Sequence, residues 1–150
     1  MKKQLFLSDY REVADSHANK LRQALVVVDT LIPLTIRTLK TAAIEQIALL
    51  DMVTTRFGKL QDVMGAHIFP LLLEQLGEIN VPSFIDKLNR LEKLHYIDDA
   101  QWWMDLRTLR NEMAHEYPND ESVCDKFNAF IPKAYELLEY WDALKQKIKP

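Results

Sequence analysis

The sequence contains little of what several functional classes require. Of its 150 residues, only Cys124 is a cysteine and only three are glycines. One cysteine excludes an intrachain disulfide and a cysteine-based zinc site, and it is typical of a reducing compartment, so we expect a cytoplasmic protein. The glycines, Gly58, Gly65 and Gly77, are too far apart to form a phosphate-binding loop. Nucleotide-binding folds that depend on such a loop are therefore excluded.

Neither charge sign dominates, and no apolar run is long. The net charge is −3 and the isoelectric point is about 5.8. This balance argues against a protein that coats nucleic acid non-specifically, although it leaves room for a small local site. The most apolar segments are interrupted by Asp29, Glu45 and Asp51, well short of the roughly 20 apolar residues that a spanning helix needs. We therefore expect no membrane segment.

Apolar residues recur three and four positions apart, and no alternating run is bounded by hairpin turns. The pattern predicts one all-α domain over residues 1–150, an up-and-down bundle of four to five helices. The expected helices run from a cap at Ser8 or Asp9 to Pro33, from about Thr35 to Gly77 with a kink or break near residues 65–70, from Pro82 and Ser83 to Leu94, from about Asp99 to His115, and from about Ser122 to Lys147 with an interruption at Pro132.

The fourth expected helix has two distinct faces. At about 100° per residue, one narrow stripe is apolar and predicts the core face, through Trp102, Leu106, Leu109, Met113 and Tyr117. A separate arc of about 140° holds Arg110, Trp103, Ala114, Arg107, Asn111 and His115. Because Ala114 adds no bulk and arginine presents a rigid fork, this arc could approach a phosphate or a second copy of the chain. By geometry alone, the arc could equally be an ordinary polar surface.

The amino-acid sequence of this segment resembles that of a known family. Residues 110–117 read RNEMAHEY, which is similar to the R-x4-H-x-Y signature of HEPN-domain toxins that are paired with minimal nucleotidyltransferases. Three further stretches resemble one subfamily of these toxins: RFGKLQD at 56–62, LNRLEKL at 88–94, and LRTLRNEMAHEYP, which contains the motif. The resemblance covers most of the chain.

This resemblance implies a homodimeric helical bundle in which the motif helices of two subunits line one cleft. Arg110 would neutralise the scissile phosphate of an RNA, His115 would move a proton, and Asn111 would hold the phosphate or the histidine. The reaction would be metal-independent cleavage that leaves a cyclic phosphate, in a type VII-like toxin–antitoxin pair. Tyr117 matches the tyrosine that a nucleotidyltransferase antitoxin modifies with AMP to silence the toxin.

Other residues of the arc extend this hypothesis. Arg107, Trp103 and Ala114 are candidate contacts to RNA or to the second subunit. Because Arg110 and His115 lie about 140° apart on the wheel, a two-fold dimer would bring Arg110 of one chain to His115 of the other.

Two alternatives belong to other classes. The chain could be a non-catalytic helical module that docks a nucleotidyltransferase or its nucleotide. The two Glu-x-x-His pairs, Glu92 with His95 and Glu112 with His115, match part of a di-iron bundle. Glu112 and His115 lie off the apolar stripe, and His95 is better placed as a helix C-cap, so we expect no metal and no cofactor.

Overall fold

Every regular element is helical in the part of the chain that the structure, a computed structural model, describes, which is residues 4–78 and 80–148. In chain order the elements are α1 (Leu7–Val28), a 3₁₀ turn η1 (Asp29–Leu31), α2 (Ile36–Thr41), α3 (Ile44–Val63), a π-helical turn η2 (Met64–Ile68), α4 (Phe69–Gln75), α5 (Phe84–Lys93), α6 (Ala100–Met113) and α7 (Asp120–Lys147). The prediction of an all-α fold is confirmed.

Side-chain caps begin four of the helices. Thr35 Oγ1 accepts from Thr38 N at the start of α2, close to the predicted start at Thr35. The starts of α5 and α6 also agree with the prediction, and α7 begins two residues before the predicted Ser122. Ser83 Oγ accepts from Asp86 N at the start of α5, Asp99 Oδ1 accepts from Gln101 N at the start of α6, and Asn119 Oδ1 accepts from Ser122 N at the start of α7.

The first helix starts differently from the prediction. It begins at Leu7, and Asp9 sits one turn inside, where its carboxylate accepts from the Phe6 N–H at 2.8 Å. The predicted cap at Ser8 or Asp9 is therefore wrong, although Asp9 still satisfies an amide at the helix start.

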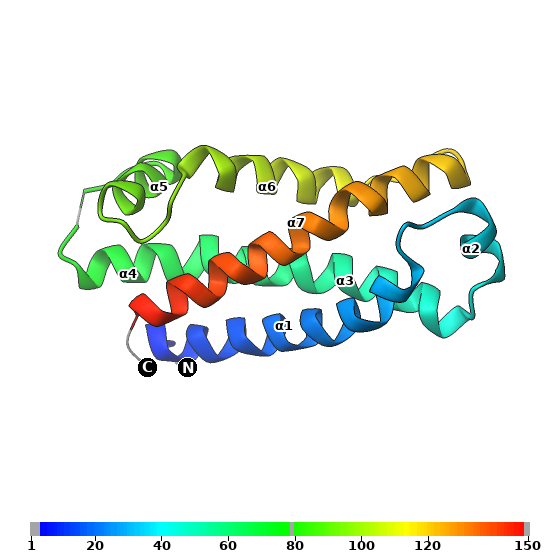
Figure 1. The fold of residues 1–150 in the computed structure, drawn as a ribbon. Coiled ribbons are helices and arrows are strands. Elements are labelled where there is room, and N and C mark those ends of the chain that lie inside the picture. The colour runs from blue at the N-terminus through cyan, green and yellow to red at the C-terminus, as the bar shows by residue number, and fades with distance from the viewer. Residues whose placement is uncertain (1–3, 79, 149–150) are drawn as a thin grey trace.

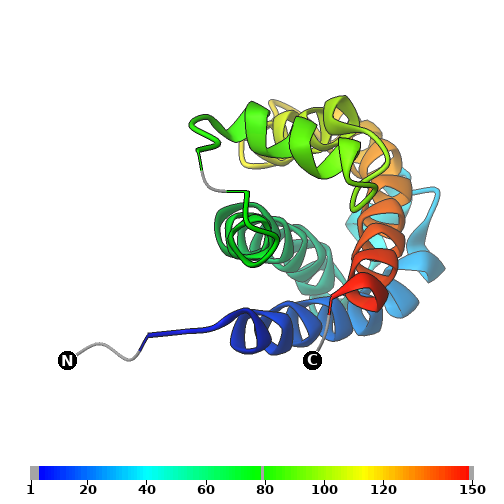
Figure 2. The same ribbon diagram turned by 90° about the vertical axis from the view of Figure 1, so that its left-hand side faces the viewer.

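The long helices alternate in direction, as Figure 1 shows. Helix α1 leads away from the N-terminal end, α3 and α4 return beside it, α6 runs out again and α7 crosses back over the bundle (Figure 1). Figure 2 looks along the helices and shows α1, α7 and the α5–α6 pair curving around α3 and α4. Helix α3 packs against α1, α6 and α7, so it is the central element of the core.

The core that fixes these helices is apolar and aromatic. Val53, Phe57 and Leu60 of α3 are fully buried, and the Phe57 ring meets Phe130 of α7 edge to face with centroids 4.8 Å apart. Trp141 of α7 is also fully buried, and its indole N–H donates to Asp15 of α1 at 2.9 Å. These contacts hold α3 in the position from which it faces α6.

The predicted helix from Thr35 to Gly77 is divided in two places. The kink expected near residues 65–70 corresponds to the π-helical turn η2, and Pro70 follows it in the first turn of α4, where the missing N–H costs little. The break at Ala42 and Ala43 was not predicted. Both alanines are extended, with ψ near 150°, and the Gln46 side chain caps the free N–H of Ala43.

The interruption expected at Pro132 is wrong, because α7 continues through it. A proline inside a helix removes one hydrogen bond and costs about 3 kcal/mol. Phe130, Ile131 and Ala134 are all buried around this position, so the packing of the helix offsets the cost. No helix in the described ranges combines the length and apolar character needed to cross a membrane.

Candidate functional site

The motif residues lie at and beyond the C-terminal end of α6. The helix ends at Met113, Ala114 is its C-cap, and His115 and Tyr117 belong to the segment that leads to α7. The apolar stripe predicted for this helix extends to Tyr117, but the helix itself ends four residues earlier, at Met113. Tyr117 does not join the core stripe; it is 37% exposed, and Asn111, Ala114 and His115 are exposed as well.

Arg110 is held by two contacts to α3. Its Nη1 and Nη2 donate to the two carboxylate oxygens of Asp62 at 2.9 and 2.8 Å, a bidentate pair. The guanidinium also lies against Gly58, since a Cβ added at that glycine would come within 3.0 Å of Arg110 Nε. Half-buried Arg110 thus has a fixed position against α3.

One face of α3 connects the motif residues. Asp51, Thr55, Gly58 and Asp62 are spaced by three and four residues, which places them within about 60° on the helix and over roughly 16 Å of its length. Asp51 and Thr55 line a groove with His115, whereas Gly58 and Asp62 contact Arg110. We call this line of contact between α3 and α6 the α3–α6 seam.

The groove at the end of the seam has a volume of about 510 Å³ and includes His115, Tyr117 and Lys126 of α7. The Lys126 ammonium donates to the His115 carbonyl at 3.1 Å and lies 4.5 Å from the centre of the Tyr117 ring. Partial burial lowers the pKa of Lys126, and the charge of nearby Asp51 opposes that shift. Sequence reasoning missed Lys126, because it lies on the next helix.

Lys126 is the residue that fixes the segment carrying the histidine and the tyrosine. Within the described ranges, the imidazole of His115 has no hydrogen bond to another side chain, and the residue is held through its backbone, whose N–H donates to the Glu112 carbonyl at 3.1 Å and whose carbonyl accepts from Lys126. The groove does not include Arg110, so a single chain places the arginine and the histidine at two separate points of the seam.

A second hollow, of about 190 Å³, opens at the other end of the seam. Its lining consists of α3 and η2 residues, Phe84 of α5, and two residues of α6: Gln61, Asp62, Gly65, Ala66, Phe84, Trp103 and Arg107. The Arg107 guanidinium lies over the Phe84 ring, 4.9 Å from its centre. Arg107 is exposed, as expected for a contact residue.

The two neighbouring tryptophans differ from the prediction. Trp103 is 1% exposed and packs edge to face on Phe69, with ring centroids 4.8 Å apart, so it is a core residue and not a free surface contact. Trp102, which the wheel placed in the core, is only half-buried. The actual core face of α6 is thus rotated toward Trp103, Leu106 and Met113.

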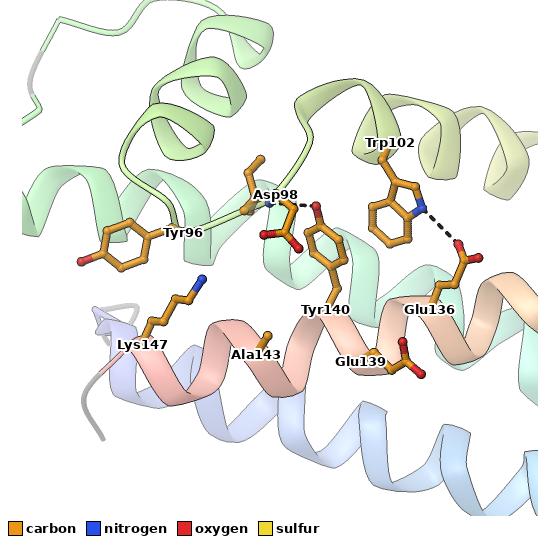
Figure 3. A pocket seen from close by; sticks show the side chains of 9 residues that line it. Tyr96, Asp98, Trp102, Glu136, Glu139, Tyr140, Ala143 and Lys147 are labelled. Atoms are coloured by element: carbon orange, nitrogen blue, oxygen red, sulfur yellow. Dashed lines mark hydrogen bonds between the residues drawn. The ribbon is translucent and has the colours of Figure 1, made fainter.

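Trp102 instead attaches α6 to α7 beside a further hollow of about 370 Å³, shown in Figure 3. Its ring stacks on Tyr140 with centroids 4.1 Å apart, and its N–H donates to Glu136 at 3.0 Å. The Tyr140 hydroxyl accepts from the N–H groups of Asp98 and Asp99. Because these polar groups satisfy one another, the arrangement stabilises the start of α6.

The pair Glu92 and His95 has a structural role. His95 follows α5 with a φ of 65°, so it is the left-handed C-cap that the sequence predicts. In the described ranges, no three acidic, imidazole or thiol side chains come together in a way that would hold a metal.

Comparison with known proteins adds no relative. No protein-family model matches the chain, and the searches of curated proteins and of solved structures find no significant match.

Proposed function

We propose that this protein is a metal-independent endoribonuclease whose site is the exposed motif on the α3–α6 seam. The observation that carries the proposal is the fixed position of Arg110. A bidentate carboxylate and a close glycine hold its guanidinium at the helix surface, next to the exposed Asn111. Two of its five N–H groups bind Asp62, and the others are available to a phosphate.

The chemistry follows from the residue types. An imidazole can accept the proton of a ribose 2′-hydroxyl near neutral pH, which frees the 2′-oxygen to attack the adjacent phosphorus. The bond from phosphorus to the 5′-oxygen then breaks, that oxygen takes up a proton, and a 2′,3′-cyclic phosphate remains. We assign the proton transfers to His115, and the stabilisation of charge on the phosphate to Arg110, with Asn111 as a further donor.

The separation of Arg110 from His115 supports a dimeric site. His115 lines a groove that does not include Arg110, whereas a two-fold arrangement can bring each arginine to the histidine of the partner. We therefore propose that the active unit is a homodimer.

We also propose that a nucleotidyltransferase antitoxin silences the enzyme at Tyr117. The tyrosine is accessible and shares the groove with His115. Attack of its hydroxyl oxygen on the α-phosphorus of ATP would release pyrophosphate and leave AMP in the groove, beside the Lys126 ammonium. Mass spectrometry of the protein incubated with ATP and the candidate partner tests this step. A gain of one AMP, absent in Tyr117→Phe, supports it, and an unmodified Tyr117 beside a modified second residue contradicts it.

The nuclease is tested by incubating the purified protein with total RNA in EDTA. We expect cleavage with cyclic-phosphate ends by the wild type, and none by Arg110→Ala or His115→Ala. The matched controls are Arg90→Ala, whose side chain is similarly exposed and paired with Glu78, and His95→Asn, which keeps a residue that tolerates positive φ. Loss of cleavage in the controls, or its persistence in the motif variants, would contradict the assignment and favour a non-catalytic module that docks the nucleotidyltransferase.

A further inference from the structure

The hollow of about 190 Å³ beside the Arg110–Asp62 pair has the features of a ligand site. It lies where α3 passes into the π-helical turn η2, and such turns occur frequently at functional sites. Asp62 lines it and also binds Arg110, so the hollow and the arginine share one residue. Its volume is below the roughly 300–1,000 Å³ typical of pockets for whole small molecules. It therefore suits a single ring system.

The unusual residue of this hollow is Gln61. Its side chain is 3% exposed, and both its amide nitrogen and its amide oxygen lack a hydrogen-bond partner among the described residues. A buried amide without partners is costly, and native proteins rarely keep one without a reason. A ligand that offers one donor and one acceptor side by side would satisfy both atoms.

The other walls favour a flat group. Gly65 lies beside two aromatic rings, since a Cβ added there would be 3.5 Å from both Phe84 and Trp103, in ordinary van der Waals contact. The Phe84 ring carries the Arg107 guanidinium on its face, so the entrance combines an aromatic surface with a positive charge. Aromatic and arginine planes of this kind bind nucleobases of single-stranded RNA by stacking.

We infer that this hollow binds one nucleobase of the RNA, next to the phosphate that Arg110 contacts, and that the base is adenine. A glutamine amide forms two hydrogen bonds with the N6 and N7 edge of adenine, which matches its unpartnered donor and acceptor. The inference rests on the proposed function for the identity of the ligand. Binding of this base would give the nuclease a preference for the sequence around the cleaved bond.

Short 2′-O-methyl oligonucleotides test the inference without cleavage, because the methylated 2′-oxygen cannot attack phosphorus. We would measure, by fluorescence anisotropy, the affinity of an all-uridine oligonucleotide and of three others with one central adenosine, guanosine or cytidine. We expect the adenosine oligonucleotide to bind the wild type at least about fivefold more tightly than the others. Gln61→Met should reduce the affinity for the adenosine oligonucleotide to that for the all-uridine oligonucleotide. Gly65→Ala, which narrows the hollow, should weaken the preference for adenosine.

Folding and function can be separated in this experiment. Gln61→Met removes the unpartnered amide at nearly constant volume, so its melting temperature should equal or exceed that of the wild type. Arg110→Ala should weaken all four oligonucleotides alike, because it acts on the phosphate. If a wild type that cleaves RNA binds all four oligonucleotides equally, the base pocket is overturned and the nuclease stands. A preference for guanosine or cytidine, or a preference that survives Gln61→Met, has the same meaning.

The opposite outcome is also decisive. If the wild type neither cleaves RNA nor binds the oligonucleotides, the proposed function fails, and free adenosine then tests the hollow by ligand-observed NMR. Saturation transfer to adenosine from the wild type but not from Gln61→Met would establish a nucleoside pocket that serves a free nucleotide. Equal transfer from both proteins, or none from either, would overturn it.

Discussion

Gly58→Ala should leave the stability of the protein nearly unchanged and remove its activity. The glycine is buried inside α3, where replacement by alanine ordinarily stabilises a helix by about 0.5–1 kcal/mol. The new Cβ would lie 3.0 Å from Arg110 Nε, which is tighter than ordinary side-chain contacts, and 3.5 Å from Nη2, which is an ordinary van der Waals contact. The flexible arginine must therefore shift by a few tenths of an ångström or more and lose its bidentate geometry with Asp62.

The net stability change can be bounded from the same contacts. The paired side chains are 39% and 54% exposed, so the ion pair contributes only about 0–1 kcal/mol. The free energy of unfolding should thus change by between about −0.5 and +1 kcal/mol, and the melting temperature should shift by no more than about 2–4 °C. RNA cleavage should fall toward the level of Arg110→Ala, since the guanidinium no longer meets the phosphate correctly.

Thermal melting and single-turnover cleavage of one RNA would test this prediction. The matched control is Gly58→Ala in the Arg110→Ala background, because there the same methyl group has no guanidinium to displace. Adding Gly58→Ala to Arg110→Ala should cause no further loss of cleavage. Full cleavage by a folded Gly58→Ala variant would refute the claim that the position of Arg110 against α3 matters.

Three further predictions concern stability. Met113→Ala should lower the free energy of unfolding by about 2–4 kcal/mol, because Met113 is 5% exposed; a urea titration that shows no loss would contradict the core face assigned to α6. The pKa of His17 is lowered by burial and by the neighbouring Arg56, whose Nη1 donates to the His17 ring nitrogen. The folded state therefore favours the neutral ring. The histidine of the unfolded chain protonates near pH 6.5, so stability should fall as the pH drops below that value, and His17→Gln should reduce this slope in urea titrations. Burial and a hydrogen bond to Asp29 raise the pKa of Tyr135 to about 12, whereas an unfolded tyrosine ionises near pH 10, so stability should fall between pH 10 and 12. Burial raises the pKa of Tyr140 as well, so Tyr135→Phe should reduce that fall without removing it, and an unchanged slope in the variant would refute the assignment.

The helices were predictable where the local chemistry is decisive. Ser83, Asp99 and Asn119 accept the first free amides of their helices, and their short polar side chains are the usual signal of a helix start. The alanines at the break, Ala42 and Ala43, carry no such signal, because alanine is a strong helix former; the cap comes from Gln46, whose side chain accepts from the Ala43 N–H. At Pro132 the prediction failed in the opposite direction: proline predicts an interruption, but the burial of Phe130, Ile131 and Ala134 around it outweighs that local preference.

The site was predictable in part. The polar arc correctly included Arg107 and Arg110, but its boundary was displaced because the helix was extended through His115 and Tyr117. The expected core face was displaced for another reason, because it was drawn through the apolar Trp102 and Leu109, which the structure leaves half-buried, and not through Trp103, which it buries.

Two residues near the site were not predicted at all. Gln61 has the spacing of a core position, four residues after the buried Phe57, but its polarity suggested a surface. Lys126 meets the motif only through the packing of α7, which no local pattern contains.

Mixing two inactive variants tests most directly whether Arg110 and His115 form one site across a dimer. Arg110→Ala and His115→Ala would be denatured together, refolded in equal amounts, and assayed for RNA cleavage in EDTA. A heterodimer would keep one intact pair, Arg110 of one chain with His115 of the other, so random mixing should restore about a quarter of the wild-type activity. An inactive mixture, with mixed dimers confirmed by a size tag on one variant, would contradict the composite site.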